Sequence, residues 1–146
     1  MKIDYNNIGV GAIAIGAVLS ISNKLSVPKA TLVLPIITHT ESLYYLSRKT
    51  TQAPSVEKLI SEKTSYFSNF NSRYYDALTL SFTSIQYLTE MGYARLDEGA
   101  LLKTKPLEYD TNMGNRAKKI FQAANNISSI LKGSDKTLFL NLRVQL

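Results

Sequence analysis

Hydrophobic and polar positions change their spacing several times along this chain of 146 residues, and the longest apolar run comes near the start. Residues 8–19 read IGVGAIAIGAVL, with only apolar residues and glycine. A helix that is apolar on all sides is buried on nearly all sides. The run therefore predicts a buried helix over 8–21, in which Gly9, Ala12 and Gly16 let another helix or a partner's backbone approach closely.

Other interpretations of this run fit less well. A transmembrane helix needs about 20 apolar residues, and Ser20 and Ser22 dilute the run before that length. A signal peptide has an apolar core of this kind, but here Asp4 offsets Lys2 in front of it. The glycine spacing matches no phosphate-binding loop. We expect a cytoplasmic protein without membrane contact, and an exported or anchored protein is the alternative.

The next segment combines prolines with a run of aliphatic residues. Pro28 and Pro35 bracket the apolar residues 30–34. Since proline lacks a backbone donor and favours an extended residue before it, this segment predicts a short edge strand or an extended crossing segment. Residues 38–40 then offer N-caps for a short helix, and His39 is expected to be a cap or a hydrogen-bonding residue rather than a ligand.

Helical spacing follows in two stretches. The first begins after Pro54, with Val56, Leu59, Ile60 and Phe67 on one face. The second, over 74–91, carries a single apolar stripe and ends at Gly92; its members are Tyr74, Leu78, Phe82, Ile85 and Leu88. Aromatic residues concentrate between the two helices, where we expect them in the core, and a platform for stacked bases is the alternative.

A hairpin and a basic helix complete the pattern. Residues 93–96 and 100–104 predict two strands around a tight turn at 97–99, and a helix that runs straight into a hairpin is typical of a winged-helix domain. The helix predicted over 115–132 carries its cations in its first turns, at the unfavourable end of the helix dipole, which suggests an anionic neighbour. Alternating residues over 137–145 predict a terminal strand.

Together these elements predict a mainly α, α+β fold. It is a compact helical domain over 1–146, with a helix-hairpin core at 55–104, a winged-helix-like β-hairpin, a basic helix and a C-terminal strand. A chain of this length buries about 70% of the surface that its unfolded form exposes, so one core suffices.

The amino-acid composition excludes several kinds of catalytic and metal-binding site. The sequence has no cysteine and one histidine, which excludes disulfides, thiolate zinc sites, cysteine nucleophiles and multi-histidine metal sites. We therefore expect no enzymatic activity, no metal and no cofactor. The net charge is +6, and most of it lies in residues 103–146, where eight Lys and Arg face three Asp and Glu. Such an imbalance favours a polyanionic neighbour, either nucleic acid or an acidic protein surface, and a solvated lysine-rich face is the alternative.

The order of these elements resembles the small middle component of bacterial three-component ABC systems, a group that includes Lamassu-type anti-phage and anti-plasmid defence. The resemblance extends from Asn7 to the C-terminus. Its most specific parts are LVLPIITH at 32–39 and the closing helix with the apolar strand predicted after it, over 120–142. It implies a non-enzymatic subunit that bridges an SMC/Rad50-like ABC ATPase and an effector, commonly a nuclease, and helps to hold the effector inactive until the ATPase senses foreign DNA.

Two sets of candidate residues follow. For the bridging subunit, the predicted partner interface consists of Gly9, Ala12, Gly16, Leu34, Pro35, His39, Leu140, Leu142 and Arg143. The alternative is a small winged-helix DNA-binding regulator, whose phosphate contacts would come from Arg95, Lys103, Lys105, Arg116, Lys118 and Lys119. The two functions are compatible, because a bridging subunit can also touch DNA held by its complex.

Overall fold

The computed structural model describes the chain from Tyr5 to Leu146, and its side chains from Gly9 onward. Most of it is helical, which confirms the expected mainly α, α+β class. The helices are α1 (Tyr5–Ser22), α2 (Val27–Ile37), α3 (Thr40–Ser47), α4 (Val56–Glu62), α5 (Phe70–Glu90), α6 (Asn115–Ile130) and α7 (Asp135–Asn141). The strands are β1 (Lys24–Ser26), β2 (Ala94–Asp97) and β3 (Ala100–Lys103), and 3-10 turns lie at η1 (Thr64–Phe67) and η2 (Thr111–Met113).

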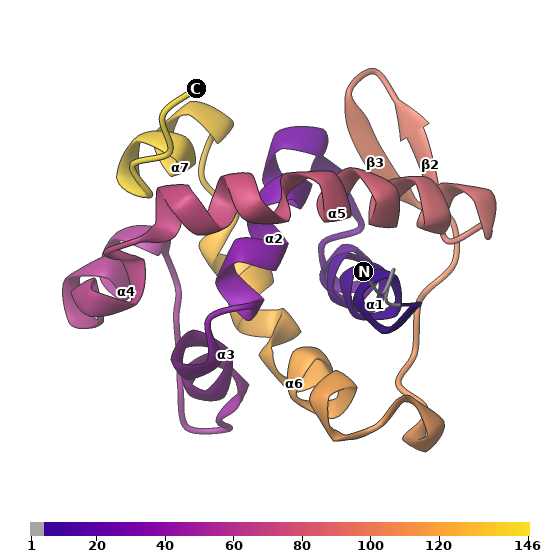
Figure 1. Cartoon of the computed structure of the whole chain (residues 1–146), viewed down its shortest axis with the longest axis horizontal. Helices are drawn as coiled ribbons and strands as arrows, with labels where there is room; N and C mark the ends of the chain where they lie inside the picture. Colours follow the sequence, from indigo (N-terminus) through magenta and orange to yellow (C-terminus); the bar gives the residue numbers. More distant parts are fainter. Residues whose placement is uncertain (1–4) are drawn as a thin grey trace.

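The helix α1 forms the centre of the packing. It contacts both α5 and α6, and the side chains of Ala14, Ile15 and Val18 are completely buried. In Figure 1, α5 runs across the molecule, with α7 near its N-terminal end and the hairpin near its C-terminal end. The apolar run therefore does form the buried helix that its pattern predicts. Within the part of the chain that is described, none of the helices has the length and apolar content needed to cross a bilayer.

The predicted hairpin is confirmed and gains a third strand. The sheet is antiparallel with the order β1-β3-β2, and Leu101 pairs with Leu25 on one side and with Leu96 on the other. Glu98 and Gly99 have φ angles of 48° and 78°, as a two-residue turn that matches the twist of a hairpin requires. The strand β1 has only three residues, too few for a periodic signal in the sequence.

The predicted strand or extended segment around residues 30–34 is wrong, because this segment is the helix α2. Ser26 caps it by accepting a hydrogen bond from the Lys29 N–H, and Pro28 lies in the first turn, where a missing N–H costs nothing. Pro35 lies in the last turn, so it removes only one late hydrogen bond. Residues 30–37 are all buried, and this burial outweighs the local preference of the prolines.

The predicted terminal strand is also wrong, because residues 135–141 form the helix α7. Ser134 caps its start, and burial follows helical spacing: Leu138, Phe139 and Leu142 are buried while Leu140 is 68% exposed. The helix ends in a Schellman motif, in which Val144 N–H donates to Phe139 O at 3.1 Å and Arg143 takes a φ of 57°. Alternation of leucines in the sequence did not reveal this arrangement.

Two details of the predicted helices need correction. The stretch after Pro54 is not one helix as far as Phe67, because α4 ends at Glu62 and Phe67 belongs to η1. On α5, Tyr74, Ile85 and Leu88 are buried as expected, but Phe82 is 50% exposed. Gly92 ends α5 as predicted, with a φ of 81°. The basic helix is confirmed as α6, with Ile120, Ala124 and Ile127 buried.

Candidate partner interface

The small residues of α1 mainly serve the packing of this chain itself. A Cβ on Gly16 would lie 2.7 Å from Leu107 Cδ2 and 3.2 Å from Leu88 Cδ2, and Ala12 is only 5% exposed. These close approaches are made by α5 and by the loop after the hairpin. Gly9 is different, because it is half-buried and a Cβ there would meet no atom of the described residues within 4 Å. Of the α1 residues in the predicted interface, Gly9 alone lies where a partner could reach it.

Three other residues of the predicted interface lie in the chain's own core. Leu34, Pro35 and Leu142 are buried, so their side chains face the interior rather than an open surface. Leu140 and Arg143, by contrast, are exposed. The predicted set therefore does not form one continuous surface.

His39 has the capping role that the sequence predicts. Its Nδ1 accepts a hydrogen bond from Ser42 N–H at 3.2 Å and lies 2.8 Å from Ser42 Oγ, so the neutral ring carries its proton on Nε2. Burial, together with the positive charge of Arg73, lowers the pKa of His39 from its ordinary value of 6.5, while Glu41 opposes the shift. A neutral His39 can keep its cap on α3, because a protonated Nδ1 could not accept.

Large apolar side chains are exposed at both edges of the outward side of α5, with Phe82 at one edge and Tyr87 and Met91 at the other. Phe82, Tyr87 and Met91 are 50%, 43% and 51% exposed, and we call them the α5 surface. The polar residues among them are mostly uncharged, with Thr83 and Gln86 nearest. Burying such side chains against a partner releases water from apolar area, at roughly 25 cal/mol for each Å². The sequence placed Phe82 in the core and so missed this surface.

A second apolar surface lies at the C-terminus. A hollow of about 390 Å³ is bounded by α7, the final residues and the start of α2, and we call it the α7 groove; its lining is Pro28, Asp135, Lys136, Phe139, Leu140, Val144 and Leu146. Leu140 and Leu146 are 68% and 91% exposed at its rim. Exposed apolar area of this kind, rimmed by charged residues, is typical of an interaction site.

The predicted nucleic-acid residues divide into two groups. On the hairpin side, Lys103 Nζ donates to Ser20 O at 3.1 Å and Lys105 Nζ lies 4.4 Å from the Tyr93 ring, while Arg95 is exposed. The other group, Arg116, Lys118 and Lys119, lies at the start of α6. In Figure 1, α1 lies between the hairpin and α6. The six cations therefore do not share one face.

The helix α5, which precedes the hairpin, has few positive charges that could bind DNA. Arg73 is the only Lys or Arg in the sequence of α5. Its Nε donates to Pro35 O at 3.2 Å and an Nη donates to Tyr66 O at 2.9 Å, and burial lowers the pKa of its guanidinium. Neutralising phosphates requires Lys or Arg side chains, and α5 supplies none beyond Arg73. The helix α5 therefore fits the recognition helix of the predicted winged-helix DNA binder poorly.

Groups that could carry out catalysis do not converge among the described residues. No three His, Cys, Asp or Glu side chains lie close enough there to hold a metal ion. A hollow of about 650 Å³ near the start of α5 is lined mainly by hydroxyls, amides and apolar side chains, with Arg143 as its charged member. General acid and base catalysis needs a titratable group within hydrogen-bond reach of a substrate, and this hollow offers no carboxylate or imidazole.

Comparison with known proteins identifies the family. Neither the search of curated proteins nor the search of solved structures finds a match. A family model described as ABC-three component (ABC-3C) system Middle Component 3 matches residues 17–146, which extends from α1 through the hairpin to the C-terminus. The chain therefore belongs to the Middle Component 3 family of ABC-three component systems.

Proposed function

We propose that this chain is a non-enzymatic bridging subunit that links an SMC/Rad50-like ABC ATPase to an effector, a nuclease, in anti-phage or anti-plasmid defence of the Lamassu type. The observation that carries the proposal is the family match over residues 17–146, because a middle component works with the other components of its system. In this role the chain holds the effector inactive until the ATPase engages foreign DNA.

The distribution of exposed apolar side chains supports a bridge. A bridging subunit needs two surfaces that can be occupied at once, and the α5 surface and the α7 groove meet this need. Met91 lies at the C-terminal end of α5, and α7 packs near its N-terminal end, as Figure 1 shows. Tyr74, whose ring packs 5.6 Å from that of Phe139 in the α7 groove, lies about 12 Å along the helix from Phe82 and about 26 Å from Met91. The two surfaces are therefore separate, and in this proposal a different partner occupies each.

The test is co-purification. The chain is expressed together with its genomic neighbours, captured by an affinity tag and washed with salt, and the retained proteins are identified by mass spectrometry. We expect an ABC ATPase and a second, effector subunit to remain bound. Recovery of the chain alone would contradict the proposal.

Two variants separate the two surfaces. Phe82→Glu and Leu140→Glu each place a charge where an apolar side chain would be buried, at a cost of several kcal/mol in binding. Each should release one partner and keep the other. Asn112→Glu is the matched control, because Asn112 is exposed in η2 and lies in neither surface. Release of both partners by the control, or retention of both by the two variants, would refute the assignment of these surfaces.

A further inference from the structure

The outward face of α6 carries polar and basic side chains only. Lys118, Lys119, Gln122 and Asn125 recur at helical spacing, while Ala117, Ile120, Ala124 and Ile127 face the core. The cation of Lys119 lies 4.1 Å from the ring of Tyr44 on α3. This contact places the basic face of α6 beside α3, and Tyr44 and Lys119 are 75 residues apart in the sequence.

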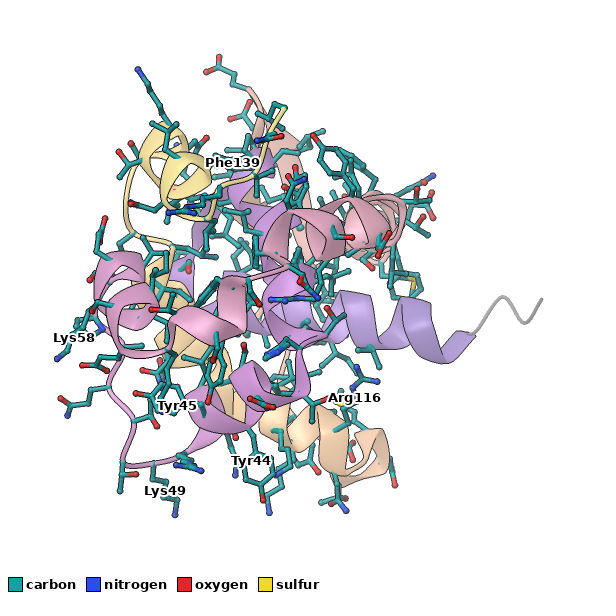
Figure 2. The ribbon with its side chains drawn as sticks, turned by 60° about the vertical axis from the view of Figure 1, so that its left-hand side comes forward. Tyr44, Tyr45, Lys49, Lys58, Arg116 and Phe139 are labelled. Atoms are coloured by element: carbon teal, nitrogen blue, oxygen red, sulfur yellow. The ribbon has the colours of Figure 1, made fainter. Side chains whose placement is uncertain are left out.

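The loop after α3 adds two more cations to the same face. Asn126 fastens this loop to α6: its Nδ2 donates to Leu46 O at 2.9 Å and to Thr51 O at 3.2 Å, and its Oδ1 accepts from Ala53 N–H at 3.1 Å. Arg48 and Lys49, both exposed, lie within the fastened segment. Tyr44 and Lys49 lie along the lower edge of the view in Figure 2.

Two shallow hollows, each of about 290 Å³, lie along this junction. Lys118 and Lys119 line the first, Arg48 and Lys49 line the second, and Gln122 lines both. Their remaining lining is amide or hydroxyl, without a carboxylate or a large apolar side chain; it consists of Asn115, Ser47, Thr51, Asn125 and Asn126. We call Arg48, Lys49, Lys118, Lys119 and Gln122 the α3–α6 basic surface.

No ion pair between described residues uses these charges. Among the side chains that the structure describes, the one ion pair joins Lys58 to Glu62, on α4. The helix α3 contributes one negative charge, that of Glu41 in its first turn. The first turn of α6 contributes a further positive charge, that of Arg116. The surface therefore holds uncompensated positive charge, which attracts a polyanion.

From this geometry we propose that the α3–α6 basic surface binds the phosphate backbone of nucleic acid. Arg, Lys, Asn and Gln are among the side chains that contact phosphate and sugar, and they supply no apolar centre. An acidic protein would be expected to bring an apolar core to its interface, and a membrane-bound segment needs apolar side chains to insert, so both fit this surface less well. Contact through phosphates alone would be independent of base sequence.

The composition of this surface differs from the one predicted from the sequence. It keeps Lys118 and Lys119 but replaces the hairpin cations with Arg48 and Lys49. The inference does not depend on the bridging role, because the α5 surface and the α7 groove lie on other elements. A result that refutes the bridging role does not refute nucleic-acid binding, and the reverse is also true.

Binding is tested with the full chain and a labelled DNA duplex of about 20 base pairs, by fluorescence anisotropy between about 50 and about 200 mM salt. We expect affinity to fall with salt, with a logarithmic slope of about −0.9 for each phosphate contacted. The double variant Lys49→Glu/Lys118→Glu should bind about tenfold or more weakly and lose about two units of slope. Unlabelled duplex of unrelated sequence should compete equally.

The control is Arg95→Glu/Lys136→Glu, which makes the same change in net charge on the hairpin and α7. It should bind with nearly the slope of the parent chain. All four side chains are exposed, and thermal unfolding followed by circular dichroism checks that both variants are folded. Equal losses in the two double variants, no binding at about 50 mM salt, or tighter binding to polyglutamate or to anionic vesicles than to DNA would overturn the proposal.

Discussion

Ser84 lies at the contact between α5 and α1, and its hydroxyl is buried without a hydrogen-bond partner among the described residues. The two helices approach closely here, since a Cβ on Gly11 of α1 would lie 2.1 Å from Ser84 Oγ. A buried hydroxyl without a partner costs about 1–3 kcal/mol. Replacing Ser84 with alanine removes this cost and adds a few tenths of a kcal/mol of helix propensity. We expect Ser84→Ala to raise the free energy of unfolding by about 1 kcal/mol or more.

Ser81 is the matched control, because it lies one turn earlier on α5 and is equally buried. Its Oγ donates to Ala77 O at 3.0 Å, so its hydroxyl is satisfied. Ser81→Ala gains the same helix propensity but loses a hydrogen bond of about 1 kcal/mol, and should change stability little or lower it slightly. The two variants should therefore differ by about 1–2 kcal/mol.

The measurement is urea unfolding followed by circular dichroism, with equal m-values for the parent and both variants. If Ser84→Ala destabilises the protein as much as Ser81→Ala does, then the Ser84 hydroxyl is satisfied in solution and the reasoning from its burial fails. A change in the m-value would indicate an altered denatured state instead, and the comparison would then be made from thermal unfolding.

Three further predictions concern the ends of α3 and α7 and the hydrogen bonds that Asn126 makes to the loop after α3. The pKa of His39 in the folded chain lies below 6.5, so the unfolded chain binds more protons as pH falls, and the stability that His39 contributes above pH 6.5 declines below it. His39→Asn caps the helix without titrating, so it should flatten the profile of Tm between about pH 7 and about pH 5. An unaltered profile would count against the cap. Asn126→Ala should lower the free energy of unfolding by about 2 kcal/mol or more and weaken DNA binding, because the three hydrogen bonds of Asn126 hold the loop that carries Arg48. Unchanged stability in urea would show that these hydrogen bonds do not hold the loop. Arg143→Gly should raise stability by about 1 kcal/mol, since glycine has no penalty at a φ of 57°, and a lower Tm would show that the arginine side chain contributes more than its backbone costs.

Local signals in the sequence determined much of the fold. The unbroken apolar run made α1 a buried helix, a histidine beside threonines marked the start of α3, and Gly92 marked the end of α5. Turn residues revealed the hairpin as well. In each case a few neighbouring residues supply the whole physical cause, so no tertiary contact was needed to see it.

Tertiary structure decided the rest, because the deciding contacts join distant residues. Prolines at the ends of residues 27–37 favoured an extended segment, and burial of that whole stretch made it a helix. The leucines near the C-terminus alternate like a strand, yet packing of Leu138 and Phe139 on the core made α7. Contacts between distant residues also determine the α5 surface and the α3–α6 basic surface. Exposure of Phe82 depends on what covers α5, and the α3–α6 basic surface exists because Asn126 holds a loop more than 70 residues away against its own helix. Sequence spacing carries no information about such contacts, because they arise only when the elements pack together.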